Sequence, residues 1–226
     1  MQAIMETAFD VIYLSTVIII GIMMIKKTGD NKKYKLFGLM ALILGVGDAF
    51  HLIPRSYALF TTGLEANAAA LGMGKLITSI TMTIFYVLLY LFWRKRYQIT
   101  ERKWLSNLIY GLAIIRIILC FFPQNDWFNY NASISWGIYR NIPFALMGLI
   151  ILGLFYNEAK KRDDQFFQFM WLAVTLSFAF YVPVVLWAKT ATWIGMLMIP
   201  KTLAYVWIVF MGFNSFKNRS EEDLIG

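Results

Sequence analysis

Ionisable side chains stand inside long apolar stretches of this sequence, at spacings that place several of them on one helical face. Asp48, His51 and Arg55 occupy positions i, i+3 and i+7, and Glu6 and Asp10 are four residues apart, so each set shares one face of a helix. A carboxylate one turn away from an imidazole can orient the ring, and the two groups together can act as a general acid and base. If the protein is an enzyme, Asp48 and His51 are therefore the candidate catalytic residues.

Cationic side chains lie deep in three further apolar stretches. Lys75, Arg116 and Lys201 each cost roughly 2.5–3.5 kcal/mol to place at the centre of a bilayer, so we expect them to face the interior of a bundle and to mark a site. They predict a water-accessible cavity in the outer half of the bundle, which binds or transports a small polar or anionic solute or binds a lipid head group. The predicted ligand-binding residues are Asp48, His51, Lys75, Arg116, Tyr181, Lys201 and Tyr205.

Structural alternatives remain open for part of this set. Glu6, Arg55 and Arg140 stand near predicted helix ends, where a long side chain can snorkel to the membrane interface without any role in binding. Asp48 and His51 are alternatively a structural pair that holds two helices together. A structural ion pair between Asp48 and a lysine is a further reading.

The composition indicates the environment in which these groups act. Of the 226 residues, 59% are hydrophobic and 15% are charged, whereas charged residues approach about a quarter of a soluble domain. Apolar runs long enough to cross roughly 30 Å of hydrocarbon recur along the chain. We expect an all-α integral membrane protein whose partner is the lipid bilayer, with residues 1–226 forming a single polytopic domain. The predicted spans are 6–25, 35–54, 67–93, 104–122, 140–157, 166–187 and 192–213.

Basic residues predict the direction of these seven spans. Most of the 21 basic residues lie after spans one, three, five and seven, and basic loops stay in the cytoplasm. The N-terminus is therefore predicted outside and the C-terminus in the cytoplasm, in a plasma membrane. The same clustering between apolar runs argues against a nucleic-acid partner. The oligomeric state cannot be read from the sequence.

The first three spans show a weak internal sequence similarity to the last three, with the fourth span between them. The matched segments are Ala49–His51 with Pro54 against Ala179–Tyr181 with Pro183, and Lys75 against Lys201. This 3+1+3 plan has parallel repeats, because spans one and five run in the same direction. It resembles the sugar-efflux and PQ-loop transporters and, more distantly, the seven-helix opsins. The Pro-Gln pair that names the PQ-loop family is absent, since Pro143 is followed by Phe144.

Two further patterns limit the chemistry. Gly47-Asp48 is similar to a Gly-Asp pair of the lysoplasmalogenase-like membrane proteins, but no second aspartate follows within spans five to seven. With one histidine and one cysteine, the multi-histidine and cysteine-rich zinc sites cannot be built. We expect no metal and no cofactor, we assign no family, and we favour binding or transport over catalysis while leaving a lipid-modifying enzyme open.

Lys201 has one more reading, in the last span. A lysine in the seventh helix resembles the retinal-binding lysine of opsins, so a retinal-type photoreceptor is a further alternative. Pro200 removes a backbone donor beside the lysine and predicts a kink that opens a pocket there. Aromatic walls for a chromophore would come from Tyr181, Trp187, Trp193 and Tyr205.

Overall fold

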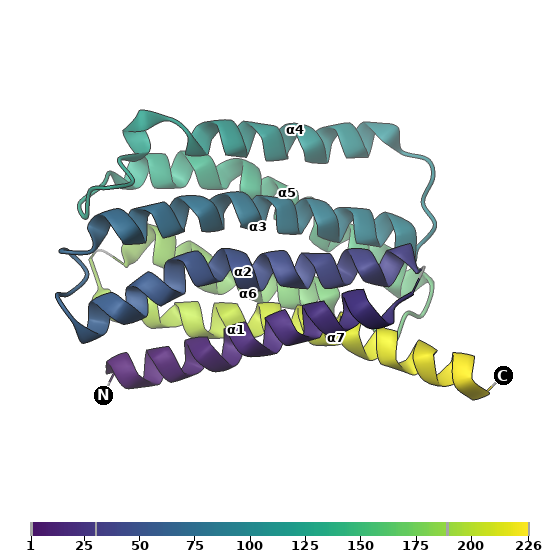
Figure 1. The fold of residues 1–226 in the computed structure, drawn as a ribbon. Coiled ribbons are helices and arrows are strands. Elements are labelled where there is room, and N and C mark those ends of the chain that lie inside the picture. Colours follow the sequence, from purple (N-terminus) through teal and green to yellow (C-terminus); the bar gives the residue numbers. More distant parts are fainter. Residues whose placement is uncertain (1, 30, 189, 226) are drawn as a thin grey trace.

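Seven helices of membrane-spanning length run through the computed structural model, which describes residues 2–29, 31–188 and 190–225 (Figure 1). They are α1 (Gln2–Lys27), α2 (Lys32–Phe60), α3 (Ala68–Arg96), α4 (Lys103–Cys120), α5 (Ile134–Lys161), α6 (Met170–Trp187) and α7 (Met198–Ile225). Two 3-10 turns, η1 (Pro123–Asn125) and η2 (Thr192–Leu197), precede α5 and α7. The described residues contain no β-strand. The prediction of an all-α chain with seven membrane-length helices is confirmed.

Four of the differences between the helix boundaries and the predicted spans bear on the site. α2 continues past Pro54 to Phe60, and α5 begins at Ile134, where the Ser133 side chain accepts a hydrogen bond from the Ser135 N–H and caps the helix. α6 begins only at Met170, because the residues before it form turns. These differences arise at helix ends, where hydropathy carries little information.

The fourth difference concerns the last span, which starts as the 3-10 turn η2 and becomes α-helical at Met198. Pro200 is then the third residue of α7. Its missing N–H lies in the first helical turn, where backbone donors have no partner within the helix. The predicted kink inside the helix is therefore wrong, because the proline lies in the first turn, where η2 passes into α7.

Helix packing follows the order of the chain. α2 lies between α1 and α3, α6 lies between α5 and α7, α4 contacts α3 and α5, and α7 returns to α1 and α2. Small residues let the backbones approach, as is common between helices in lipid. A Cβ at Gly21 would lie 2.9 Å from the carbonyl oxygen of Gly38, and one at Gly74 would overlap the backbone of Phe50.

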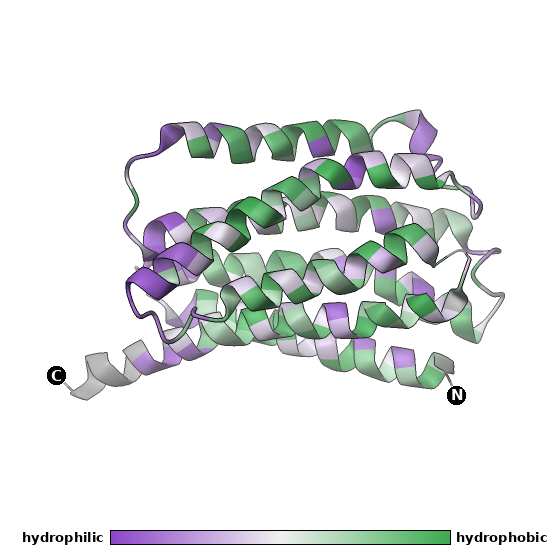
Figure 2. Cartoon of the chain, turned by 180° about the vertical axis from the view of Figure 1, so that it is seen from behind, coloured by the Kyte–Doolittle hydropathy of each residue, from purple (hydrophilic) through white to green (hydrophobic). Residues whose placement is uncertain are grey.

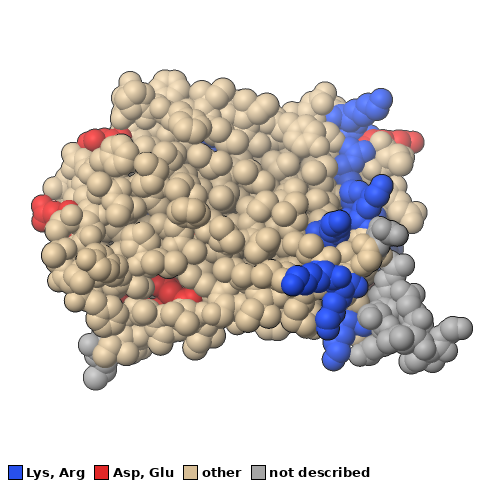
Figure 3. All heavy atoms as spheres, in the orientation of Figure 1, with Lys and Arg blue, Asp and Glu red and all other residues tan. Residues whose placement is uncertain are grey.

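The two ends of the bundle differ in charge. The termini lie at opposite ends (Figure 1), and the middle of the helices is mostly hydrophobic, whereas hydrophilic residues concentrate toward the ends (Figure 2). On the face that Figure 3 shows, Lys and Arg gather at the end where the C-terminus lies. We call this end the basic end, and the other the N-terminal end. The orientation in the membrane and the internal duplication stay predictions.

Candidate functional site

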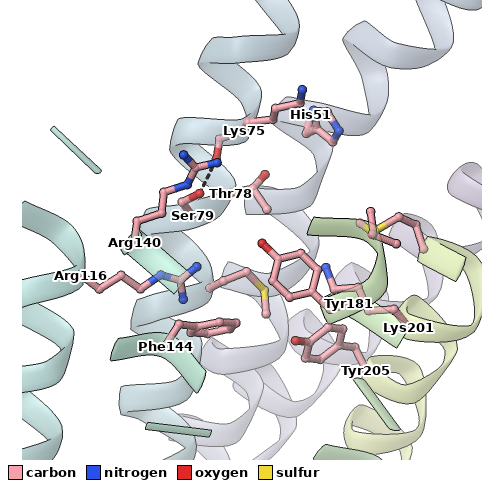
Figure 4. Close-up of a pocket in the computed structure, with 13 residues that line it drawn as sticks. His51, Lys75, Thr78, Ser79, Arg116, Arg140, Phe144, Tyr181, Lys201 and Tyr205 are labelled. Atoms are coloured by element: carbon pink, nitrogen blue, oxygen red, sulfur yellow. Dashed lines mark hydrogen bonds between the residues drawn. The ribbon is translucent and has the colours of Figure 1, made fainter. Parts of the chain in front are cut away.

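All of the predicted ligand-binding residues except Asp48 line one cavity of about 200 Å³. The cavity lies in the half of the bundle toward the N-terminal end, between α2, α3, α4, α5, α6 and α7 (Figure 4). Asp48 lines an adjoining cavity of about 270 Å³, and both cavities include His51, Lys75 and Lys201 in their walls. Because a water molecule takes about 30 Å³ in the liquid, each cavity has room for several water molecules or a small ligand.

Arg116 enters this cavity from α4. Its side chain is almost fully buried, at 2% exposure, and its Nε and Nη1 have no hydrogen-bond partner in the described part of the chain. The guanidinium points toward the cavity above the Phe144 ring (Figure 4), with its central carbon 3.5 Å from the ring centroid. Nothing in the sequence singled out Phe144, since a phenylalanine after a proline is an ordinary part of an apolar helix.

Lys201 faces the same cavity from the first turns of α7. The lysine is 7% exposed, and its Nζ lies 4.9 Å from the ring centroid of Tyr181 and 5.4 Å from that of Tyr205. The ammonium therefore has two aromatic faces beside it. Trp187 and Trp193, by contrast, are 51% and 67% exposed. The expected chromophore walls at these two tryptophans are thus absent, and only the tyrosines line the cavity.

Asp48 and His51 do not form the expected pair. The Tyr13 hydroxyl donates a hydrogen bond of 2.7 Å to Asp48 Oδ2, and Asp48 also interacts electrostatically with Lys201. His51 Nδ1 is buried without a hydrogen-bond partner among the described residues, and Lys75 extends toward this histidine (Figure 4). Asp48 and His51 line the same adjoining cavity without a hydrogen bond between them among the described residues, and the enzyme hypothesis stays a prediction.

Arg140, for which snorkelling to the interface was one alternative, lies in the wall of the central cavity. Its Nη1 donates a 2.8 Å hydrogen bond to Asn125 Oδ1, and its guanidinium lies 4.2 Å from the Trp127 ring centroid. Asn125 is itself buried and donates to the carbonyl of Leu119. Arg140 is thus held in the cavity wall by the loop between α4 and α5. Hydropathy places such an arginine near a helix end but cannot reveal this loop.

Glu6 and Arg55 also pair instead of snorkelling separately. Arg55 Nη2 lies 3.1 Å from Glu6 Oε2, which joins α1 to α2 at the wall of the adjoining cavity. Their charges offset each other. The central cavity, in contrast, is lined by Lys75, Arg116, Arg140 and Lys201 with no carboxylate among its lining residues.

The basic end of the bundle holds an ionic cluster that the sequence did not indicate. Arg96 forms a two-pronged pair with Asp164, with both N–O distances 2.9 Å, and Tyr97 donates to the same carboxylate. Arg96 also donates to Ser215 Oγ on α7, which Tyr34 of α2 contacts as well. These contacts tie together α2, α3, α7 and the segment between α5 and α6.

Aromatic side chains fill the bundle next to this cluster. The Phe37 and Phe92 rings are 4.8 Å apart, and the Phe92 and Phe167 rings are 5.1 Å apart, measured between centroids. All three side chains are fully buried. The central cavity and this ionic and aromatic packing therefore occupy opposite ends of the same bundle.

Comparison with protein-family models, with curated proteins and with solved structures finds no match to this chain. The resemblances in plan to PQ-loop transporters, opsins and lysoplasmalogenase-like proteins thus gain no support from these searches. The functional argument depends on the geometry of the cavity.

Proposed function

We propose that the protein binds a small oxyanion in the central cavity and carries it across the membrane. One observation carries this proposal: Arg116 is buried against the cavity with two nitrogens that lack hydrogen-bond partners in the described chain. Unsatisfied buried donors are costly. A carboxylate or phosphate accepts hydrogen bonds from a guanidinium in a two-pronged geometry and removes this cost.

The other cations strengthen the argument. Lys75, Arg140 and Lys201 line the same cavity, so a bound anion would meet positive charge from four helices in a region of low dielectric. Asp48 reaches the cavity only from the adjoining space. The excess of cations favours an anionic ligand over a cationic or neutral one.

The asymmetry of the bundle favours transport over binding alone. A cavity in one half and an ionic and aromatic closure in the other form the arrangement that alternating access requires in one of its states. In this proposal the N-terminal end faces the outside and the basic end faces the cytoplasm of a plasma membrane, in keeping with the distribution of Lys and Arg (Figure 3).

The alternatives are less well supported. A lipid-modifying enzyme needs an acid–base pair, and Asp48 is hydrogen-bonded to Tyr13 rather than to His51. A retinal protein would use Lys201, but the same cavity holds three further cations that a Schiff base leaves unexplained.

The test is anion binding by the purified protein in lipid nanodiscs. Thermal stabilisation by phosphate, sulfate, lactate and succinate would be measured at constant ionic strength against a chloride background. We expect at least one oxyanion to stabilise the protein, and Arg116→Gln and Lys201→Met each to weaken its binding at least tenfold. Lys160→Gln is the matched control, because Lys160 is exposed at the basic end beside Tyr156. Equal weakening by all three variants, or no stabilisation by any oxyanion, would refute the proposal.

Uptake into proteoliposomes separates transport from binding. An anion that stabilises the protein should accumulate in vesicles that contain it, and Arg116→Gln should abolish this uptake. Binding without uptake would leave a receptor-like function in place of the transporter.

A further inference from the structure

A narrow apolar groove runs between α5 and α6 on the side of the bundle, with a volume of about 140 Å³. Its walls are mostly aliphatic and aromatic side chains, among them Ile138, Ile142, Val182 and Leu186. Ile142 is 51% exposed and Val182 is 44% exposed. In a membrane this surface faces the lipid, so the groove is open to the hydrocarbon rather than to water.

The two helices pack closely at one end of the groove. Gly148 is in direct contact with Phe178, and a Cβ at Gly148 would overlap that ring. The groove lies between this contact and the end of the bundle at which α5 begins and α6 ends. It is therefore closed toward the basic end and opens in the same half of the bundle as the central cavity.

Two side chains separate this groove from the cavity. Phe144 and Tyr181 line both spaces. Arg116 lies on the cavity side of Phe144, and Lys201 lies beside Tyr181. An apolar space on the side of the bundle thus adjoins a cationic space, and the rings of Phe144 and Tyr181 form the wall between them.

Phe144 is the firmly packed half of this wall, since its ring is buried against Tyr86 and Phe178, and Tyr181 is the half with the weaker hold. Tyr181 donates a long hydrogen bond of 3.3 Å to Asn141 Oδ1 across the two helices. Pro143 on α5 and Pro183 on α6 lie inside their helices, and each removes one backbone hydrogen bond next to the wall. Local changes in either helix are therefore less costly here than in an uninterrupted helix.

We infer that the anion bound in the cavity is the head of a membrane amphiphile, which enters sideways from the bilayer between α5 and α6. Its phosphate or carboxylate would lie between Arg116 and Lys201, and its hydrocarbon chain would lie in the groove. This inference rests on the proposed function and names its substrate class. The hydrocarbon chain of the ligand gains little free energy by moving from the lipid to the groove, since both are apolar. What the groove provides is a route by which a head group can reach a buried site while its chain stays out of water.

The test compares two ligands with the same head, inorganic phosphate and dodecyl phosphate, on the protein in nanodiscs. Ala145→Phe places a ring in the groove, which Ala145 lines. Leu149→Phe is the matched control, because Leu149 is 62% exposed on the same helix outside the groove. We expect Ala145→Phe to weaken the binding of dodecyl phosphate at least tenfold, with its concentration expressed per mole of lipid. The same substitution should change the binding of inorganic phosphate less than twofold. Leu149→Phe should change neither.

A second measurement does not depend on the folding of Ala145→Phe. Dodecyl phosphate with a photoreactive group at the end of its chain should label peptides of α5 and α6 in the unaltered protein, and Arg116→Gln should suppress this labelling. The lateral route is wrong, and the anion site stands, if phosphate binds but dodecyl phosphate binds to Ala145→Phe as tightly as to the unaltered protein. The same conclusion follows if the photoreactive ligand labels all lipid-facing helices alike. If neither ligand binds the unaltered protein, the proposed function fails with it.

Discussion

The guanidinium carbon of Arg116 lies 3.5 Å from the centroid of the Phe144 ring, while Nε and Nη1 of the same side chain have no hydrogen-bond partner in the described chain. A desolvated cation–π contact contributes about 2 kcal/mol, and each unsatisfied donor costs roughly 1–3 kcal/mol. The ring therefore offsets only part of the cost of burying this arginine. Such an arrangement is expected of a group kept for a ligand.

Replacing Arg116 by methionine tests this balance. Methionine keeps a long flexible side chain against Phe144 and removes the unpartnered donors, so we expect the ligand-free protein to become more stable by about 1–3 kcal/mol. Stabilisation by added oxyanion should disappear at the same time. Thermal unfolding in detergent with and without phosphate measures both effects. A clear loss of ligand-free stability would instead mean that Arg116 is a structural residue.

The pair between Arg96 and Asp164 should make a large contribution to stability at the basic end. The two side chains are 19% and 5% exposed, and removing one partner of a buried pair costs about 3–5 kcal/mol. We expect Arg96→Gln and Asp164→Asn each to destabilise strongly, and the double variant to be little worse than either one. Arg162→Gln is the control, because the Arg162 side chain is 46% exposed in its pair with Glu158 and exposed pairs contribute less than about 1 kcal/mol. Additive losses in the double-mutant cycle would contradict the pairing.

Tyr97, which follows α3, should make the free energy of unfolding depend on pH in the alkaline range. Burial raises the pKa of Tyr97 above its ordinary value, and the nearby Asp164 carboxylate raises it further. The folded protein then keeps a proton that the unfolded chain releases near pH 10, so this contribution to stability is fully present below about pH 10 and decreases as the pH rises above it. Unfolding measured between pH 8 and 11 should show a smaller decrease in Tyr97→Phe. Identical profiles for the two proteins would count against this coupling.

Close packing of α2 on α3 depends on Gly74. A Cβ there would overlap the carbonyl of Phe50 and lie 2.7 Å from the Cα of His51. Because both obstacles are backbone atoms, we expect Gly74→Ala to destabilise by about 1–3 kcal/mol. Gly111→Ala on α4 is the matched control, since no atom lies within 4 Å of its added Cβ, and it should be neutral or stabilising by up to about 1 kcal/mol. Equal unfolding temperatures for the two variants would show that the helices can separate without cost.

The proposed orientation can be checked by labelling single cysteines in intact cells. Gln124 lies in the exposed loop between α4 and α5, and Thr100 lies in the exposed loop between α3 and α4. A membrane-impermeant maleimide should label Gln124→Cys in intact cells and Thr100→Cys only after permeabilisation. Cys120 is buried and should give little background. The reverse pattern would invert the topology.

The sequence predicted the membrane helices, and it selected ionisable residues that the structure places around one cavity, because both depend on local rules. Apolar length predicts a span, and an ionisable residue deep in a span is expected to face the bundle, which is how Lys75, Arg116 and Lys201 were selected. What could not be predicted depends on contacts between distant segments. The pairing of Asp48 with Tyr13, the loop contact of Arg140 with Asn125 and the Arg96–Asp164 pair join residues whose meeting follows from tertiary packing alone.

The ends of the helices were also predicted poorly from the sequence. Hydropathy averages over a window, so it placed the last span as one helix from residue 192, whereas the α-helix begins at Met198 after a 3-10 turn. The expected effect of Pro200 depends on where the helix begins. With the helix starting at Met198, this proline belongs to the first turn and does not kink the helix.

The aromatic packing of Phe37, Phe92 and Phe167 beside the Arg96–Asp164 pair has a consequence for the cell that contains this protein. Charged groups inside a membrane bundle attract water, and a continuous column of water would let protons and salt ions leak along their electrochemical gradients. With one half of the bundle filled by close-packed rings, the column ends inside the protein. If the protein is the transporter proposed above, this packing would make the resting molecule an electrical insulator and so preserve the voltage across its membrane.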